Sequence, residues 1–199
     1  MPFFQSRILH PAAGAGLAAV LLIGMSRVIA PSDLQPPAAA EAAVRDWPKD
    51  LQALASVLIE QYGPPDSADA ESLVWHGNGS WRKTVLRRKG FTRTFLSGTR
   101  DHLEQVIAYH VPEDKLPLLK RFDRRLEANA ATRELISRAD REAMNFLALN
   151  LADDIVKGER GVLEARIFIE KALRLERAGK SSPYLEGFVF ALQDPAAPQ

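Results

Sequence analysis

Cysteine is absent from the 199-residue chain. Its absence excludes disulfide bonds, thiolate metal sites, a thiol nucleophile and the attachment of a lipid to cysteine. Core packing alone must therefore hold the fold, which is feasible for a single domain of this size. A strong charge imbalance is also lacking, because the formal net charge is only +1. Any electrostatic partner must then be recognised by a local patch, and we expect no nucleic-acid partner.

Four common sequence signatures of catalysis and nucleotide binding are missing as well. The chain has no nucleophile elbow, phosphate-binding loop, dinucleotide fingerprint or HExxH pattern. We therefore expect no cofactor and no metal site.

The first thirty residues have the layout of an export signal. Arg7 precedes an uncharged, mostly apolar run from Pro11 to Ser26, and a short basic region before an apolar region is typical of secretory signals. The run is shorter than the about 20 residues that a spanning helix needs, although Arg27 could snorkel if the run extends to Ala30. An amphipathic or buried N-terminal helix of a cytosolic domain fits poorly, because the run leaves no polar face.

Residues 1–30 are thus predicted to be a signal peptide or a membrane anchor, with residues 11–30 contacting the membrane. The prediction places the protein in the cell envelope. The domain is either membrane-anchored on the extracytoplasmic, periplasmic side, or secreted if the N-terminus is cleaved.

The rest of the chain divides by composition into a linker, a domain and a tail. Residues 31–45 are rich in proline and alanine and are expected to be a linker. Residues 46–193 are predicted to form a single α+β domain, and residues 194–199 a tail. The predicted order is a helix, a small antiparallel sheet and a C-terminal αα-hairpin.

The first part of the domain predicts a helix followed by strands. Asp46 is expected to cap a helix that ends at the Gly63-Pro64-Pro65 run. The Asn78-Gly79 pair predicts a hairpin turn, and Trp75 and Trp81, which flank it, are expected to pair across the strands. Further strands are predicted over 91–96 and 102–111.

The second part is predominantly helical by its pattern. A short helix capped by Asp114 is expected, and residues 126–139 are compatible with either a helix or a pair of strands. Residues 140–157 and 162–178 predict two helices whose short connection favours antiparallel packing. The first of these is nearly apolar all round, so Asn145 and Asn150 are expected to be buried and hydrogen-bonded to neighbouring backbone.

Several short segments carry a family likeness. They are Tyr62-Gly63-Pro64-Pro65-Asp66 with the two tryptophans that follow, residues 144–154, and Ser182-Pro183-Tyr184. With them, the chain from about residue 48 onward resembles an uncharacterised family of bacterial exported proteins. The resemblance implies an envelope setting but no reaction and no catalytic residue.

Basic residues are segregated in the middle of the chain. No acidic residue occurs between Glu71 and Asp101, and this stretch contains the candidate anion-binding residues Arg82, Lys83, Arg87, Arg88 and Arg93. The functional interpretation is contact of the segment 82–93 with anionic lipid or an anionic envelope polymer. The structural interpretation, which we favour, is a sheet edge protected against aggregation by its charges.

Three side chains are the weak candidates for catalysis. His102 and Glu104 share a strand face, and His76 is the residue that would have to join them. Because no convergent catalytic set is evident, the sequence predicts a non-catalytic binding or interaction module. A hydrolase or metal-dependent enzyme using His102, Glu104 and His76 is one alternative, and an anionic-lipid-binding module is the other.

Overall fold

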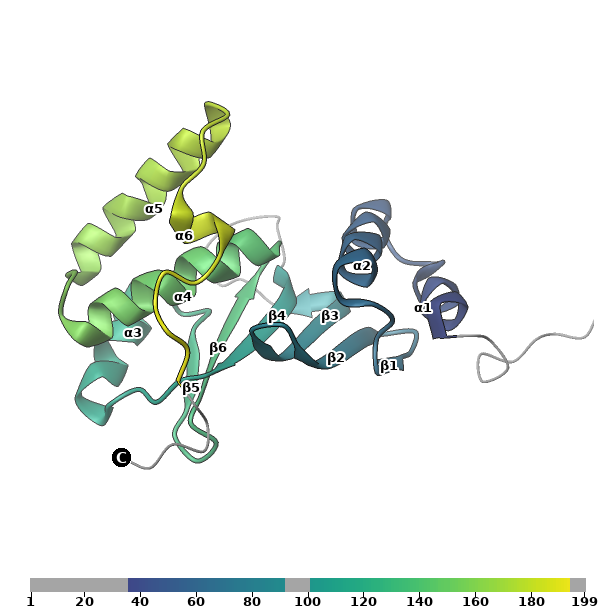
Figure 1. The fold of residues 1–199 in the computed structure, drawn as a ribbon, viewed down its shortest axis with the longest axis horizontal. Coiled ribbons are helices and arrows are strands. Elements are labelled where there is room, and N and C mark those ends of the chain that lie inside the picture. The colour runs from purple at the N-terminus through teal and green to yellow at the C-terminus, as the bar shows by residue number, and fades with distance from the viewer. Residues whose placement is uncertain (1–35, 92–100, 194–199) are drawn as a thin grey trace, which may run out of the picture.

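The computed structural model describes residues 36–91 and 101–193 and confirms the predicted α+β class (Figure 1). The elements, in chain order, are α1 (Pro36–Val44), α2 (Lys49–Tyr62), β1 (Ser67–Ala68), β2 (Ser72–Asn78), β3 (Trp81–Phe91), β4 (Asp101–Ala108), the 3-10 helix η2 (Glu113–Lys115), α3 (Leu116–Phe122), β5 (Glu127–Asn129), β6 (Glu134–Ala139), α4 (Glu142–Lys157), α5 (Val162–Arg177) and α6 (Pro183–Glu186). The predicted membrane segment 11–30 and the tail 194–199 lie outside the described residues.

One antiparallel sheet organises the domain, with the strand order β1-β2-β3-β4-β6-β5. Leu73, Leu86, Leu103 and Ala139 stand opposite one another in a row across four strands. All four are buried. Because side chains alternate along each strand, this row points to the face that the helices cover, and the next row points away from it.

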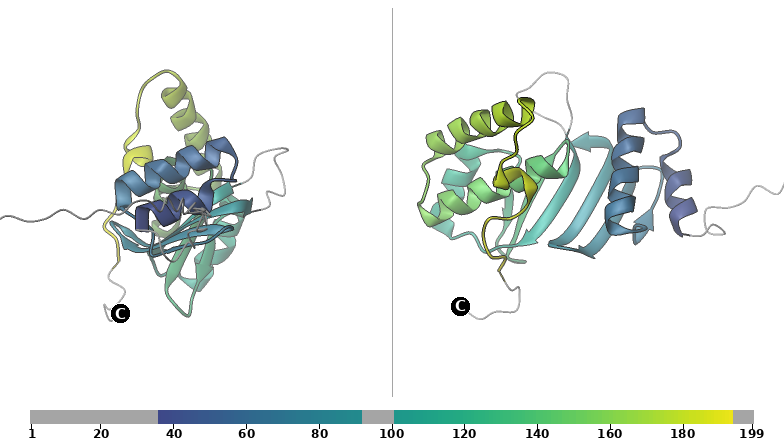
Figure 2. Two further views of the ribbon diagram at one scale, coloured as in Figure 1. Left: turned by 90° about the vertical axis from the view of Figure 1, so that its right-hand side faces the viewer. Right: turned by 45° about the horizontal axis from the view of Figure 1, so that its top comes forward.

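The helices lie on one side of the sheet, as the views in Figure 2 show. Helix α2 covers the β2–β3 end and buries Leu51, Ala55 and Leu58, which recur at helical spacing on one face. Helices α4 and α5 lie over the β4–β6 end. The result is two layers, with one hydrophobic cluster under α2 and a larger one under α4.

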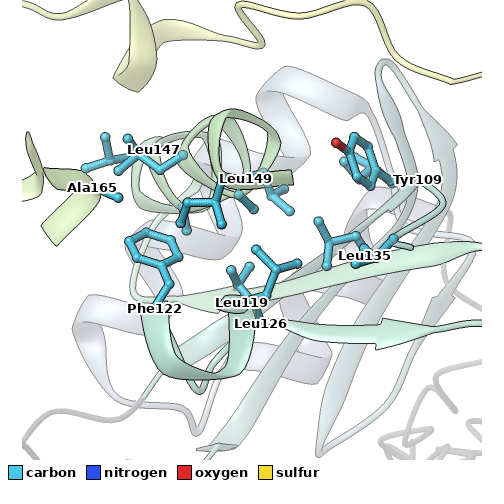
Figure 3. Close-up of a cluster of buried hydrophobic side chains, with 14 of the residues drawn as sticks. Tyr109, Leu119, Phe122, Leu126, Leu135, Leu147, Leu149 and Ala165 are labelled. Carbon is cyan, nitrogen blue, oxygen red and sulfur yellow. The ribbon is translucent and has the colours of Figure 1, made fainter. Parts of the chain in front are cut away.

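The larger cluster joins α3, α4 and α5 to strands β4 and β6 (Figure 3). Leu119 and Phe122 of α3 belong to this cluster together with Leu147 and Leu149 of α4. Helix α5 buries only Ala165 and Ala172 in it, while its larger side chains Val162, Phe168 and Ile169 are partly buried against the cluster.

Helix α1 lies in the region predicted to be a linker, so the linker prediction is wrong for residues 36–44. Ala40 is fully buried and Val44 is 7 % exposed in the cluster beneath α2. The cause is that alanine-rich sequence, here PPAAAEAAV, has high helix propensity and its small side chains pack closely. The ordered domain therefore begins earlier than composition indicated.

The hairpin forms, but its two tryptophans do not pair. Strand β2 continues to Asn78, which stands opposite Trp81, while Trp75 stands opposite Thr84. The Trp75 indole instead donates to the Gly63 carbonyl at 2.9 Å. The Trp81 indole donates to Glu142, the first residue of α4, at 2.7 Å. Each indole nitrogen therefore has an acceptor at the end of a different helix, and the two rings lie apart.

The remaining differences concern the starts of two helices and the ambiguous segment 126–139. Helix α2 has Pro48, not Asp46, at its N-terminal boundary, and Lys115, not Asp114, precedes α3. Residues 126–139 contain the strand pair β5 and β6, the second of the two options. Helices α4 and α5 form over the predicted segments. Because α5 buries only Ala165 and Ala172, their close antiparallel pairing remains a prediction.

Candidate functional site

The three candidate catalytic side chains make separate contacts. His76 is exposed, with Nδ1 3.3 Å from Asp66 Oδ2. His102 Nδ1 lies 2.8 Å from the Arg87 carbonyl oxygen. A carbonyl only accepts, so this contact places the imidazole proton on Nδ1.

Glu104 is occupied by a different partner, since it accepts a hydrogen bond from Arg138 Nε at 2.7 Å. The strand register places His76 two strands away from β4, about 12 Å from Glu104 and about 16 Å from His102. Among the described residues no group of three histidine or carboxylate side chains could hold a metal ion. The structure thus brings His102 and Glu104 to one strand face but does not bring His76 to them.

Gly90 lets the His102 ring lie close to β3. The strand register shifts between Leu86 and Phe91, and Gly90 has φ +63°. A Cβ at Gly90 would lie 2.9 Å from both the Asp101 carbonyl oxygen and the His102 ring. Position 90 therefore requires glycine, both because its φ is positive and because a Cβ would have no space there.

Two basic residues of the segment 82–93 make contacts within the domain. Arg82 lies 3.3 Å from Glu134, and Arg88 donates to the Asp46 carbonyl at 3.3 Å. These contacts tie β3 to β6 and to the segment before α2.

The other basic residues of the segment 82–93 are spread along β3. Lys83 stands opposite His76, and the Arg87 guanidinium lies 5.3 Å from the centre of the Phe91 ring. Arg93 lies outside the described residues. Binding of an anionic surface by this segment remains a prediction.

A larger concentration of arginine lines a groove elsewhere in the domain, bounded by α3, α5 and the start of α4. The groove has a volume of about 1740 Å³. Its basic lining residues outnumber its acidic ones. The basic residues are Lys120, Arg121, Arg124, Arg125, Arg138, Arg141, Arg160 and Arg166, and the acidic ones are Asp101, Asp123, Asp140 and Glu170.

Four of the groove arginines are held by carboxylates. The pairs are Arg125–Asp123 at 2.5 Å, Arg138–Glu104 at 2.7 Å, Arg141–Glu176 at 2.7 Å and Arg160–Asp154 at 2.9 Å. These contacts fix the guanidinium groups in place, and three of them bring a carboxylate from outside the groove against its walls. Fixed cations bind an anion with less loss of side-chain entropy than mobile ones do.

Three cations of the groove have no such carboxylate. No ion pair between described residues involves Lys120, Arg121 or Arg166, and all three side chains are exposed. Arg166 donates to the carbonyl oxygens of Arg121 and Phe122 at the end of α3. These hydrogen bonds hold Arg166 beside Lys120 and Arg121 and leave its charge uncompensated.

The α5 wall of the groove is mostly apolar, and Arg166 and Glu170 are its charged residues. Val162, Ile169 and Leu173 lie with Arg166 on one face, at the spacing i, i+4, i+7 and i+11. The α5 residues that are buried are Ala165 and Ala172 alone. Helix α5 therefore presents an incompletely covered apolar face next to the three free cations.

A separate polar cluster is centred on Glu142, in the first turn of α4. Glu142 accepts hydrogen bonds from Trp81 Nε1 at 2.7 Å, from Gln105 Nε2 at 2.8 Å and from Gln61 Nε2 at 2.9 Å. The Tyr62 hydroxyl donates to the same carboxylate. Burial raises the pKa of Glu142, and the Gln61 amide opposes that rise.

This cluster connects α2, β3, β4 and α4. It therefore joins the half of the domain under α2 to the half under α4. Gln105 also accepts from Asn145 Nδ2 at 2.9 Å, and Asn145 lies 3.4 Å from the Leu103 carbonyl. The expected burial of Asn145 is confirmed, since it is fully buried.

Asn150 ties α6 and the C-terminal segment after it to α4. Asn150 Nδ2 donates to the carbonyls of Tyr184 and Gly187 at 3.2 and 2.8 Å, and Asn150 Oδ1 accepts from the Val189 amide at 2.9 Å. The predicted role of this asparagine in binding backbone is confirmed. Its contacts are structural and lie outside the groove.

Sequence reasoning missed both the groove and the Glu142 cluster. A signal for the groove was present, because five basic residues fall within residues 115–125. No comparable signal marked Glu142, whose partners come from three elements distant in the sequence.

Comparisons with known proteins give no functional assignment. No protein-family profile, curated protein or solved structure matches the chain. The described helices include none that is long and apolar enough to cross a membrane. The family resemblance and the membrane segment therefore remain predictions.

Proposed function

We propose that this protein is a non-catalytic binding module whose binding site is the arginine-lined groove between α3 and α5. The observation that carries the proposal is the uncompensated group of Lys120, Arg121 and Arg166 beside an apolar helix face. Cations next to apolar surface favour a ligand that is both anionic and apolar. The whole chain has a net charge of only +1, so this attraction is local to the groove.

The size of the groove favours a macromolecular ligand. Small-molecule sites are commonly about 300–1,000 Å³ and bury most of their ligand. The groove is larger, at about 1740 Å³. A segment of a partner protein matches these dimensions better than a metabolite does.

The hydrolase alternative lacks comparable support. His76, His102 and Glu104 each have a partner of their own, and His76 stands two strands away from the other two. Alanine replacement of His102, which does not line the groove, is expected to leave ligand binding unchanged. A selective loss of function with normal stability would favour the enzyme instead.

The setting that we propose is the cell envelope, with the N-terminal segment 11–30 as signal or anchor. Support comes from the uncharged run after Arg7. Fractionation of cells that produce the full chain tests this part separately. Recovery of the chain only in the cytosolic fraction would contradict the proposed setting and leave the proposed groove untouched.

The groove is tested by site-specific photo-crosslinking in cells that contain the full-length chain. A photoreactive residue replaces Leu173 inside the groove, and a control chain carries it at Ile167, which is 60 % exposed on α5 outside the groove. We expect a discrete adduct at position 173 that disappears when Arg121→Glu is added. Equal adducts at both positions, or an adduct insensitive to Arg121→Glu, would contradict the proposed site.

A further inference from the structure

We infer that the groove binds an acidic amphipathic helix of a partner protein, aligned along α5. The inference rests on the proposed function and goes further by naming the class of ligand. The incompletely covered apolar face of α5 determines the shape of the ligand, and the three cations Lys120, Arg121 and Arg166 determine its charge.

The apolar residues of the α5 wall favour a helix over an extended strand. Val162, Ile169 and Leu173 follow the helical spacing of α5 and form a ridge along its axis. A second helix can pack its own apolar ridge beside this one, as in other helix-in-groove complexes. An extended peptide would need an open sheet edge to pair with, and the groove wall is a helix that satisfies its own backbone hydrogen bonds.

The free cations lie toward the N-terminal end of α5. Arg166 lies in the second turn of α5, and its hydrogen bonds place it against Arg121 at the end of α3. A helix in the groove is therefore expected to carry aspartate or glutamate at that end. Partly buried charge pairs of this kind contribute to specificity as well as to affinity.

The chain itself does not supply such a helix. Residues 1–35 contain Asp33 as their only acidic residue, and residues 194–199 contain only Asp194. A second copy offers α5, where four basic residues accompany its acidic ones in the range 164–177. Charge complementarity thus selects a different protein as the partner.

Fluorescence anisotropy with the full-length chain tests the inference. The probe is a fluorescein-labelled peptide of about 16 residues, the length of α5, with leucine at i, i+4, i+7 and i+11 and glutamate on the flanking positions. A second peptide has the same composition in scrambled order, so that its leucines share no face. A third carries lysine in place of glutamate, and vesicles of phosphatidylglycerol or phosphatidylcholine are tested in parallel.

The protein variants are matched in pairs. Arg121→Glu reverses a groove charge on α3, and Lys171→Glu reverses a charge on α5 outside the groove. Leu173→Gln and Ile167→Gln form the corresponding apolar pair. A circular-dichroism melt of each variant checks that the fold is retained.

We expect the amphipathic acidic peptide to bind at least about tenfold more tightly than the scrambled or lysine peptides. Arg121→Glu and Leu173→Gln should each weaken binding about tenfold, and the two control variants less than about twofold. Equal binding of the ordered and scrambled acidic peptides, with loss in Arg121→Glu, would overturn the helix inference and leave the groove as an anion site. Salt-dependent pelleting with phosphatidylglycerol vesicles and no peptide binding would overturn the inference in favour of a membrane ligand. Peptide binding that is unaffected by Arg121→Glu would overturn both the inference and the proposed groove.

Discussion

Replacement of Glu142 by alanine is the sharpest test of how the two halves of the domain are joined. The carboxylate accepts hydrogen bonds from Gln61, Tyr62, Trp81 and Gln105. Gln61 is exposed and can bond to water instead. Trp81 Nε1 lies 3.1 Å from the Tyr62 oxygen and keeps that acceptor. Two donors, from Tyr62 and Gln105, are thus left without a partner.

An unsatisfied buried donor costs about 1–3 kcal/mol. The loss from these two donors is partly offset, because the variant no longer buries a charge. We therefore expect Glu142→Ala to lower the free energy of unfolding by roughly 2–4 kcal/mol, a large part of the stability of an ordinary domain.

Urea unfolding followed by tryptophan fluorescence and by circular dichroism measures this loss. The control is Glu60→Ala, which removes an exposed glutamate of α2 and should change the free energy of unfolding by less than about 0.5 kcal/mol. A Glu142→Ala variant as stable as the Glu60→Ala control would refute the reasoning, because the cluster would then contribute nothing to the union of the two halves.

Three further predictions follow from particular contacts. Asn150→Ala should destabilise the domain by about 2–4 kcal/mol and speed amide hydrogen exchange at Val189, since the variant removes three hydrogen bonds to the C-terminal segment; unchanged exchange there would contradict it. Gly90→Ala should lower the melting temperature more than Gly79→Ala does, because both sites have positive φ but only Gly90 has atoms within 4 Å of the added Cβ; equal losses would show that the close approach is unimportant. Burial raises the pKa of Glu142 in the folded chain above its ordinary value of 4.5, so the unfolded chain releases this proton first as the pH rises. The free energy of unfolding of the wild type should therefore fall relative to Glu142→Gln just above that pH, and parallel pH profiles would contradict the expected shift.

The elements that sequence could predict are those fixed by local chemistry. The Gly63-Pro64-Pro65 run ends α2 because glycine accepts the positive φ and proline cannot continue a helix. The hairpin turn between β2 and β3 likewise forms at Gly79 and Ser80, one residue after the predicted Asn78-Gly79 pair. In both cases the decisive residues are neighbours in the chain.

The features that escaped prediction depend on tertiary contacts. Nothing local to α1 reveals that Ala40 is fully buried, since its cluster includes residues of α2 and β2. Trp75 and Trp81 were expected to stack across the hairpin, but each indole has an acceptor supplied by a distant element. An acceptor of that kind is visible only in the folded chain.

The candidate site was the least predictable part for the same reason. The groove draws its cations from α3, from the segment after it, from β6, from the loops on either side of α4, and from α5. The basic segment 82–93 stood out in the sequence because its charges are contiguous, yet Arg82 and Arg88 are used within the domain. The residues of the groove, by contrast, are separated in the chain and come together only in the fold.

Amide hydrogen exchange of the full-length chain, with and without saturating acidic amphipathic peptide, most directly tests the claim that the groove is the binding site. The slowed amides should belong to residues 118–125 and 162–173, and exchange in β2 and β3 should not change. Slowed exchange confined to the strands that carry Lys83 and Arg87 would contradict the claim and assign binding to the helix-free side of the sheet.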